Sequence, residues 1–417
     1  MLAYPKNIIF DYKTYKLYNQ FMNKINKDWK EVKLGDIVDI TMGQSPKSEF
    51  YNKRNEGMPF LQGSATFGFM HPYFETYSSD IKKIAINGSV LMSVRAPVGD
   101  LNIANADVCI GRGLCSINGK SNIINRYIFY LLSYYKPKLL NMQKGTTFGA
   151  ITKDDILNFK VLIAEDIEEQ KRIASALSKI DAYLENTIKL IGEKERFKRG
   201  IAKKLLTCKE GENIPEARFK GFEDEWMEVA ISKIGTIITG NTPSTKNESF
   251  WNGNNVWITP TDIKQKYISN SERKLTDDGL KKSRKLPANT LLITCIASIG
   301  KNAILKCEGA CNQQINAIIP NKNYNVDFLY YLFENEKSYL KFKAPQSVIK
   351  IMSKSEFSKL VFKFPLLEEQ EKIGGYLSLL DKEIDNLKKQ KELIKEMKRG
   401  AMQKLLSGEV RLVDNYD

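Results

Sequence analysis

The chain has 417 residues, of which 42% are hydrophobic and 27% are charged, and its formal net charge at pH 7 is +15. This composition excludes a disordered chain and predicts a folded protein of two to four domains. No apolar run is long enough to span a membrane, and the N-terminus lacks the continuous apolar core of a secretory signal. We therefore expect a cytoplasmic protein without membrane contact.

Cysteine and histidine usage limits the chemistry further. The six cysteines are too few for a disulfide framework in a chain of this length. Cys307 and Cys311 have a spacing compatible with a metal site, but no CxxC pair exists and His71 is the only histidine. We expect buried structural cysteines, no metal ligands and no Ser/His or Cys/His triad.

The first globular body is expected at residues 1–164. Short β-like runs such as VLMSV from Val90 alternate with turn residues, and one amphipathic helix is predicted at 126–133. A strand-rich α+β domain fits this pattern. Residues 1–27 have no counterpart later in the chain, and their role is left open.

Residues 165–210 have the pattern of one long helix. Ile173, Leu177, Ile180 and Leu184 follow one another at spacings of three and four. Acidic residues crowd the start of this segment and basic residues its end, which is the polarity that the helix dipole favours.

A second body is expected at 211–364, followed by a second long helix at 365–410 and a short tail at 411–417. In this body β-like runs are predicted at NTLLITCIASIG from Asn289 and at NAIIP from Asn316, with a helix at 327–334. The second long helix opens with EEQEKIGGYLSLLD, which repeats EEQKRIASALSKID of the first.

The whole chain reads as one unit written twice. Residues 168–207 and 368–407 share fifteen identities in forty aligned positions, and DWKEVKLGDIVDITMGQSP from Asp28 matches EWMEVAISKIGTIITGNTP from Glu225. Neither apolar stripe can face water over a helix of about 60 Å. We predict two strand-rich bodies separated by two helices that pack as an antiparallel coiled coil with pseudo-two-fold symmetry. The alternative is that each helix lies on its own body.

The excess positive charge lies on the bodies. Residues 1–164 carry a net charge of +8 and residues 211–364 carry +6, whereas 165–210 and 365–410 carry +2 and 0. This distribution favours a polyanion bound to both bodies.

Catalytic motifs are missing from the sequence. There is no P-P dipeptide, hence no N/D-P-P-Y/F loop of an adenine methyltransferase, and no GxxxxGK[ST] phosphate loop. The glycine pair at Gly111 and Gly113 is not followed by a helical pattern. We expect a non-catalytic chain that holds no cofactor.

Polar turn residues at matching places in the two bodies are the candidate DNA contacts. Arg suits guanine edges and Asn or Gln suits adenine edges, while Ser, Thr and Lys more often hold phosphates. Taken singly, each is better explained as a solvated loop residue, but the set favours DNA contact. In the first body the candidates are Gln44, Ser45, Lys47, Gln62, Ser64, Ser93, Arg95, Arg112, Lys144, Thr146 and Thr147. In the second body they are Asn241, Thr242, Ser244, Thr259, Thr261, Thr294, Gln313, Gln314, Gln346, Ser347 and Lys350, with Arg112 aligned to Gln313 and Gln314.

Two further features have open interpretations. KKSRK from Lys281 is the densest basic run and is either a solvated loop or a phosphate contact. Gly200 and Gly400 each cost a helix about 1 kcal/mol relative to alanine. Their presence in both copies indicates close approach of the two helices or contact with a partner.

These motifs, in this order and duplicated, resemble the specificity subunit of type I restriction–modification enzymes. The resemblance covers about residues 28–408 and rests on Trp29 followed by GQSP at Gly43, on Trp226 followed by GNTP at Gly240, on EEQ at the start of each helix and on KRGxxxKLL at its end. IPEARFKGFEDEW from Ile214 is typical of such a repeat, but the first repeat lacks it.

The resemblance implies two target-recognition domains, each reading half of an asymmetric bipartite site in double-stranded DNA. The helix pair would act as a ruler and dock two modification subunits, which would bring S-adenosylmethionine and methylate adenine. A restriction subunit using ATP and magnesium would join for cleavage. A protein-interaction scaffold with incidentally basic bodies is the alternative, and a self-contained enzyme is the third and weakest hypothesis.

Overall fold

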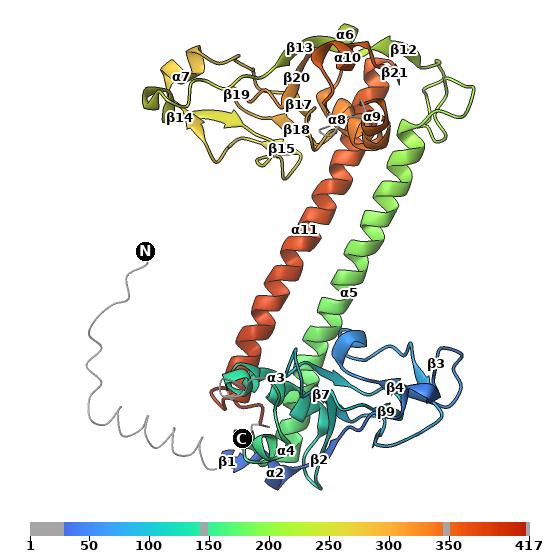
Figure 1. Cartoon of the computed structure of the whole chain (residues 1–417), viewed down its shortest axis with the longest axis vertical. Coiled ribbons are helices and arrows are strands. Elements are labelled where there is room, and N and C mark those ends of the chain that lie inside the picture. The colour runs from blue at the N-terminus through green and yellow to red at the C-terminus, as the bar shows by residue number, and fades with distance from the viewer. Residues whose placement is uncertain (1–28, 142–148, 345–350, 414–417) are drawn as a thin grey trace. The chain divides into compact units, whose positions relative to one another are not determined.

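The computed structural model describes residues 29–141, 149–344 and 351–413, which divide into two compact units. Unit 1 contains the described residues up to Ile188 and from Gln390 on, and unit 2 contains Lys189–Lys389. Two long helices, α5 (Ile167–Leu206) and α11 (Leu367–Leu406), pass from one unit into the other, so each unit has one body and one end of each helix (Figure 1).

The body of unit 1 is rich in antiparallel strands. One sheet has the order β2-β10-β7-β8, a second has the order β3-β5-β4-β9-β6 with β4 and β9 parallel, and β1 pairs with β11. The strands are β1 Trp29–Lys33, β2 Val38–Met42, β3 Tyr51–Asn52, β4 Met58–Leu61, β5 Tyr77–Ser78, β6 Ile84–Ala85, β7 Val90–Ser93, β8 Leu101–Ile103, β9 Val108–Ile110, β10 Leu114–Gly119 and β11 Lys160–Ala164. The helices of this body are α2 Leu34–Ile37, α3 Asn125–Asn141, α4 Lys153–Leu157 and the short 3-10 turns η2 Ser48–Phe50 and η3 Ser64–Thr66.

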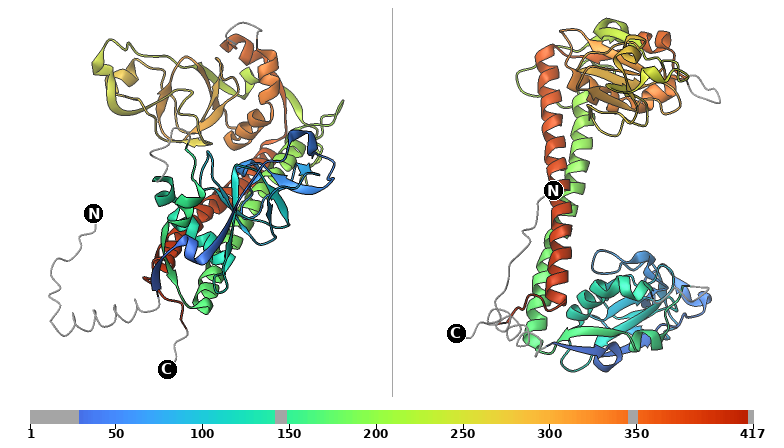
Figure 2. Two further views of the ribbon diagram at one scale, coloured as in Figure 1. Left: turned by 60° about the horizontal axis from the view of Figure 1, so that its bottom comes forward. Right: turned by 90° about the vertical axis from the view of Figure 1, so that its left-hand side faces the viewer.

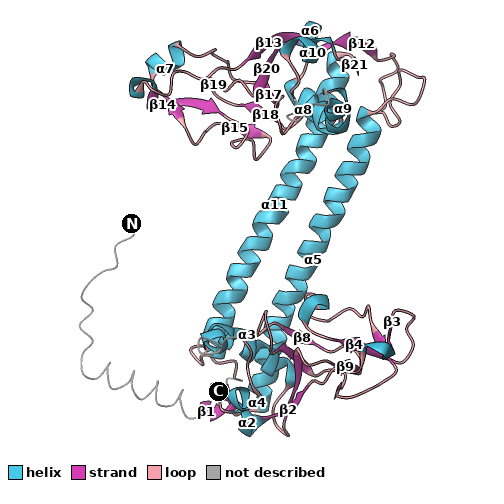
Figure 3. Ribbon diagram, in the orientation of Figure 1, coloured by secondary structure: helices cyan, strands magenta, loops and turns pink. Residues whose placement is uncertain are grey.

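The body of unit 2 repeats this plan (Figure 3). Its sheets have the orders β13-β20-β17-β18-β15 and β16-β14-β19, with β14 and β19 parallel, and β12 pairs with β21. The strands are β12 Met227–Ala230, β13 Gly235–Thr239, β14 Trp251–Ile258, β15 Tyr267–Ile268, β16 Lys274–Leu275, β17 Thr290–Thr294, β18 Asn302–Leu305, β19 Gly309–Cys311, β20 Ile315–Pro320 and β21 Val361–Phe364. Its helices are α6 Ile231–Ile234, α7 Asp277–Lys281, α8 Val326–Asn335, α9 Lys337–Lys343, α10 Lys354–Lys359 and the 3-10 turn η4 Glu248–Phe250.

Strands β7 and β17 are buried on both faces, which explains their continuous apolar sequences. Successive side chains of a strand point to opposite sides. Val90 and Met92 therefore join the core that contains α3, while Leu91 joins a second core with β4 and β9. In unit 2 Leu291 and Leu292 are divided in the same way. Each main sheet therefore has a helix, α3 or α8, on one face and a second apolar core on the other.

The helices expected inside the bodies are present, with different ends. The helix predicted at 126–133 is α3, which continues to Asn141 because Tyr135 and Leu139 still pack into the core. The helix predicted at 327–334 is α8, and α9 follows it after a break at Glu336. The run predicted from Asn289 ends as a strand at Thr294, where a loop begins.

Within each unit α5 and α11 run antiparallel (Figure 2). In unit 1, Asp181 pairs with Lys398, and Gln390 donates a hydrogen bond to Tyr183. In unit 2 the ion pairs Lys194–Glu383 and Lys388–Glu195 lie at 2.8 and 2.7 Å. Later residues of one helix meet earlier residues of the other, so the predicted antiparallel pairing is confirmed. The alternative of two separate helices is wrong.

Each body packs on the start of one helix and the end of the other. Ile173 and Leu177 from the start of α5 share the core of unit 1 with Leu405 and Leu406 from the end of α11. The core of unit 2 contains the equivalent four residues, Ile373, Leu377, Leu205 and Leu206. The duplicated helix sequence therefore provides two equivalent seats, one for each body.

A buried ion pair fixes each seat. In unit 2, Arg218 binds Glu369 through two nitrogens at 2.8 and 2.7 Å, and the indole nitrogen of Trp226 donates to the same carboxylate at 3.2 Å. In unit 1, Arg411 binds Glu169 in the same two-pronged way at 2.6 and 2.7 Å. The two glutamates are 1% and 0% exposed, so their charges depend on these arginines.

A Tyr–Asp–Lys group joins three helices in each unit. In unit 1 the hydroxyl of Tyr130 donates to Asp181 at 2.8 Å, and the ammonium of Lys398 lies 2.6 Å from the same carboxylate. In unit 2 the equivalent group is Tyr331, Asp381 and Lys198. The aspartate that ends the repeated EEQ segment and the lysine of KRG are thus partners in space.

The glycines of the long helices have two different environments. A Cβ atom at Gly200 or Gly400 would meet no heavy atom within 4 Å among the described residues, so close approach of the two helices does not explain these glycines. By contrast, a Cβ atom at Gly374 would lie 2.8 Å from the backbone nitrogen of Phe328. Among the glycines of α5 and α11, only Gly374 is required by packing against the described residues.

Within the described ranges, no helix combines the length and apolar character needed to cross a bilayer. In the same residues, no group of three or more His, Cys, Asp or Glu side chains is placed to hold a metal ion. Cys311 is fully buried in an apolar core, and burial raises the pKa of its thiol to about 12, so the thiol stays protonated.

Candidate nucleic-acid interface

Four loops bring the candidate residues of unit 1 together. They are the turn 43–47 after β2, the loop 62–66 after β4, the loop 94–100 after β7 and the turn 111–113 between β9 and β10. Backbone hydrogen bonds connect them, since Gln44 N–H donates to Ile110, Gly111 N–H to Leu61 and Val94 N–H to Gly113, at 2.8 to 2.9 Å. Residues dispersed over seventy positions of sequence therefore form one surface.

Gly43 is required where the first of these turns approaches the last. A Cβ atom at this position would lie 2.2 Å from the carbonyl oxygen of Gly111. In unit 2 a Cβ atom at Gly240 would lie 2.2 Å from the carbonyl oxygen of Asn312. The glycine of the G-x-[ST]-P turn thus permits a backbone contact in both bodies.

Three of these loops, 62–66, 94–100 and 111–113, line an open hollow of about 550 Å³ together with Ser93 at the end of β7. Its lining includes five predicted contacts, Gln62, Ser64, Ser93, Arg95 and Arg112. It also includes the carboxylate of Asp100, which the sequence did not indicate. Asp100 accepts a hydrogen bond from Ser64 at 3.1 Å and pairs with Lys136 of α3 at 2.8 Å.

Ser45 holds two residues that line this hollow, Gln62 and Arg112. Its hydroxyl oxygen accepts the backbone N–H of Arg112 at 3.2 Å, and its hydroxyl donates to the side-chain carbonyl of Gln62 at 3.0 Å. The amide NH₂ of Gln62 therefore points away from Ser45 and can bind a ligand. Gln44 and Lys47 on the same turn are exposed, and Lys47 lies 3.6 Å from Glu49.

Ser93 shapes a loop and does not present its side chain to a ligand. It is 1% exposed, its hydroxyl donates to the carbonyl of Pro97 at 2.6 Å, and its oxygen accepts the N–H of Asp100 at 2.8 Å. Gly99 in the same loop has φ 79°, a left-handed conformation that suits glycine.

Thr294 plays the same part in unit 2. It is fully buried, its hydroxyl donates to the carbonyl of Ser298, and its oxygen accepts the N–H of Lys301 at 3.0 Å. Gly300, with φ 86°, matches Gly99. Ser93 and Thr294 align as predicted, but their hydroxyls hold the loop that carries other candidates.

The loops of unit 2 are joined by the same backbone pattern. Asn241 N–H donates to Cys311, Asn312 N–H to Ile258 and Cys295 N–H to Gln314, at 2.8 to 2.9 Å. Comparison with unit 1 makes Gln313 the counterpart of Arg112 and Gln314 the counterpart of Gly113, which resolves the ambiguous alignment.

Two threonines of unit 2, Thr242 and Thr261, stand at the positions of Ser45 and Ser64 in unit 1. Thr242, in the place of Ser45, donates to the side-chain carbonyl of Gln313 at 2.6 Å. Thr259 lies 2.8 Å from the hydroxyl of Thr261 and donates to Asp262 at 2.6 Å, forming a local turn. Gln313 and Thr261 are exposed and can bind a ligand.

Two other candidates of unit 2, Asn241 and Gln314, have side chains that bond within the protein. The side chain of Asn241 donates to the carbonyl of Lys282 at 2.9 Å and accepts the N–H of Arg284 at 2.8 Å. The side-chain carbonyl of Gln314 accepts from the side-chain amide of Asn312 at 2.8 Å. Ser244 is exposed, and its backbone carbonyl accepts the indole N–H of Trp251 at 3.1 Å.

Most of the KKSRK run has local partners. Lys281 pairs with Asp278 at 2.9 Å and Lys285 with Glu308 at 2.8 Å, and the guanidinium of Arg284 donates to the carbonyl of Thr239 at 2.5 Å. Lys282 is exposed. The first two pairs leave their ammonium groups at the surface, where a phosphate can still approach.

Six predicted contacts lie outside the described residues. They are Lys144, Thr146 and Thr147 in unit 1 and Gln346, Ser347 and Lys350 in unit 2. Residues 1–27 also lie outside them.

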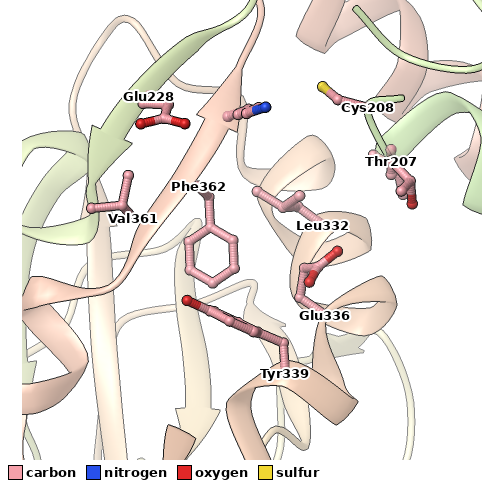
Figure 4. Close-up of a pocket in the computed structure, with 10 residues that line it drawn as sticks. Thr207, Cys208, Glu228, Leu332, Glu336, Tyr339, Val361 and Phe362 are labelled. Atoms are coloured by element: carbon pink, nitrogen blue, oxygen red, sulfur yellow. The ribbon is translucent and has the colours of Figure 1, made fainter. Parts of the chain in front are cut away.

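A separate cavity in unit 2 has a different chemistry. It is lined by residues such as Phe362, Tyr339, Leu332 and Glu336 (Figure 4). Burial raises the pKa of the Glu336 carboxyl above its ordinary range. In unit 1 the matching position on the helix is Tyr135, whose hydroxyl accepts the N–H of Leu162 at 3.1 Å. The two bodies thus differ in packing at this position, where unit 2 has a carboxyl group and unit 1 has a tyrosine ring.

The chain belongs to a family of DNA-recognition modules. The family model described as "type I restriction modification DNA specificity domain" matches residues 26–191 and again residues 223–396, most of the chain. Each match contains one body and the start of the long helix that follows it.

Several relatives have been named. A Methanocaldococcus jannaschii protein, provisionally named MjaX specificity subunit of a type I restriction enzyme, is 43% identical over 48% of this chain and 47% of its own length. The MjaIX specificity subunit from the same organism is 36% identical over 42% of each chain. The alignments thus span less than half of these two relatives. The MjaVIII specificity subunit is 23% identical over 93% of this chain and 94% of its own length.

Solved structures show the same fold. A crystal structure of the S subunit of a type I restriction–modification system from M. genitalium has a TM-score of 0.60 and 16% identity. It covers 91% of this chain and 96% of that one. A chain from a study of complex assembly in a type I system has a TM-score of 0.59 and also 16% identity, over 92% and 99% of the two chains.

Proposed function

We propose that this chain is the DNA-specificity subunit of a type I restriction–modification system and that each body reads one half of an asymmetric bipartite target. The observation that carries this proposal is the repeated four-loop frame, which has the same backbone hydrogen bonds in both units but different polar side chains. A shared backbone frame that carries two different sets of polar side chains favours two unlike half-sites. Direct contact of these side chains with base edges and phosphates is part of the proposal.

The helix pair, in this proposal, sets the separation of the half-sites and binds two modification subunits. Support comes from two equivalent helix faces. In unit 2, Phe197 is 52% exposed and Gly200 follows it one turn later, with open space above. In unit 1, Met397 is also 52% exposed and Gly400 follows it. An exposed large apolar side chain beside an exposed glycine suits the packing of a partner helix.

Catalysis belongs to the partners in this proposal. The chain lacks the N/D-P-P-Y/F loop, so the modification subunits would hold S-adenosylmethionine and methylate adenine after flipping it from the duplex. A restriction subunit would bring ATP and Mg²⁺ for cleavage. The specificity chain itself would hold none of these groups.

Mapping of methylated adenines in the host, with and without this gene, tests the proposal. We expect a bipartite motif with a fixed spacer whose methylation disappears when the gene is deleted. Methylation that is unaltered by the deletion would overturn the proposal.

The scaffold hypothesis predicts a different binding result. The chain with its modification subunit is titrated against its mapped target and against a scrambled duplex at several salt concentrations. A specificity subunit prefers the target and loses affinity steeply with salt. A scaffold binds neither duplex, or binds both equally.

A further inference from the structure

The two reading surfaces use their arginines in opposite ways. In unit 1, Arg95 and Arg112 both line the hollow, and both are exposed. Neither guanidinium has a hydrogen bond or an ion pair with any of the described residues. In unit 2 no arginine lies at either matching position, which are Ile296 and Gln313.

Two arginines near the loops of unit 2, Arg273 and Arg284, have contacts within the protein. Arg284 donates to a backbone carbonyl, as described above. The guanidinium of Arg273 lies 3.8 Å from the ring centre of Trp251 and 5.4 Å from that of Trp257. Such stacking holds a guanidinium against the protein. The surfaces therefore differ in the number of guanidinium groups they offer to a ligand.

The backbone that carries Arg112 is fixed before any ligand binds. Its N–H is held by Ser45, and its neighbours are glycines because larger residues would collide with Gln62. A Cβ atom at Gly111 would lie 2.7 Å from the Gln62 side-chain oxygen, and one at Gly113 would lie 2.5 Å from the Gln62 carbonyl. Arg112 is thus the only side chain of this turn, and its direction is set by the turn.

Arg95 is also carried by a braced loop. Ser93 ties both ends of the 94–100 loop, and Val94 N–H donates to Gly113 at 2.9 Å, which joins this loop to the turn of Arg112. A phosphate can be held by a flexible lysine, whereas paired hydrogen bonds to a base edge need a planar fork in a fixed place.

We infer that unit 1 reads a guanine through Arg112, with Arg95 as the second arginine of the same reading surface, and that unit 2 reads its half-site without an arginine fork. This inference rests on the proposed function. The planar guanidinium matches the O6 and N7 acceptors of guanine in the major groove, and no other base presents that pair of acceptors.

The experiment uses the complete complex of this chain with its modification subunits on the mapped target. Each guanine of the target is replaced in turn by 7-deazaguanine, which lacks the N7 acceptor, and affinity is measured by fluorescence anisotropy at fixed salt. We expect one position in one half-site at which the wild-type complex loses roughly 5- to 150-fold in affinity. The R112Q complex should bind the normal target and the target with 7-deazaguanine at that position with equal affinity, because the guanidinium that contacts N7 is absent.

Two variants separate base reading from loss of charge. R54Q removes the same charge from the same body, at an exposed arginine that pairs with Glu56 at 2.9 Å, and should leave the 7-deazaguanine profile unchanged. R112K keeps the charge but replaces the planar fork by a single ammonium group, so its N7 response should be smaller than that of the wild type. A uniform loss on all duplexes in R112Q, with a salt slope reduced by about one, would instead make Arg112 a phosphate contact and overturn the inference.

The failure of this inference is distinct from that of the proposed function. A wild-type complex without any bipartite preference contradicts the proposed function. A bipartite preference with no guanine that depends on Arg112 contradicts only the inference. The replaced bases alone decide the wild-type result, so it does not depend on whether a variant folds.

Discussion

Unit 1 and unit 2 share a backbone and differ in the side chains that the backbone presents. The hydrogen bonds that join the four loops recur at matching positions, and so do Gly43 and Gly240, Ser93 and Thr294. By contrast, Arg112 is replaced by Gln313 and Gln62 by Thr259. The comparison teaches that the backbone frame and the side chains it presents can change independently. Under the proposed function, a new DNA specificity therefore needs no new fold.

The helix ends on which the two bodies pack differ in the hydrogen bonds made by the matching tryptophans. Glu369 in unit 2 accepts from both Arg218 and the indole of Trp226. In unit 1 the matching indole nitrogen of Trp29 is buried and has no hydrogen-bond partner among the described residues. The arginine of unit 1 comes from the segment after α11, and that of unit 2 comes from the segment after α5. The following changes test how much this difference matters.

The largest effect is expected from R218A. This change leaves Glu369 charged and buried, which typically costs about 3–5 kcal/mol. Hydrogen exchange followed separately in the two units should show loss of protection in unit 2 and little change in unit 1. R411A should do the reverse, because it removes the partner of Glu169.

A charge-neutral rescue sharpens this prediction. The double variant R218A/E369Q should be more stable than R218A alone, since the glutamine leaves no buried charge. Equal stability of R218A and the wild type in chemical unfolding would contradict the importance of the seat.

The next effect separates two neighbouring glycines of α11. G374A places a methyl group 2.8 Å from the nitrogen of Phe328 and should destabilise unit 2 by about 1–3 kcal/mol. The methyl group of G375A meets no described atom within 4 Å, and this variant should stabilise the helix by up to about 1 kcal/mol. Thermal unfolding of the pair measures both. If both variants melted at a higher temperature than the wild type, the contact at Gly374 would be one that small shifts of the structure relieve.

G200A and G400A test the helix faces that we propose as docking sites. Each should stabilise the isolated chain by up to about 1 kcal/mol, because nothing described lies within 4 Å of the added methyl group. Each should also weaken binding of the modification subunit, measured by calorimetry. Unchanged affinity in both variants would remove these glycines from the docking surface.

The smallest effect is expected from E336Q, at the cavity of unit 2 where unit 1 has Tyr135 at the matching position. Burial raises the pKa of Glu336 in the folded state above its unfolded value. The wild type therefore loses stability as the pH rises through this raised pKa, whereas glutamine does not titrate. We expect equal melting temperatures near pH 4 and a melting temperature a few degrees higher for E336Q at pH 8. A variant that melts lower at pH 8 would mean that the carboxylate has a stabilising partner there.

The sequence predicted the repeated architecture because the signals for it are local or periodic. Two helices of forty residues, the strands at Val90 and Thr290, and the paired G-x-[ST]-P turns were all visible as patterns. The antiparallel pairing followed from the length of the apolar stripes. The extension of α3 to Asn141 was missed, because it depends on tertiary packing of Tyr135 and Leu139.

The DNA contacts stay a prediction, but the structure shows which of the candidate side chains are free to meet a ligand and which bond within the protein. The sequence indicated matching turns but not that they converge, and in the structure five candidates line one hollow in unit 1. Polarity in a turn did not distinguish a side chain that faces a ligand from one that braces the loop, as Ser93, Thr294 and Asn241 show. Asp100 and the Tyr130–Asp181–Lys398 group gave no signal, because their partners are distant in sequence.

Selection of bound duplexes from a random library, by this chain assembled with its modification subunits, tests the central claim most directly. Two unlike reading surfaces on one repeated frame predict two short conserved blocks of different sequence, separated by a spacer of constant length and free composition. A single uninterrupted block, two identical blocks or no enrichment would contradict the account.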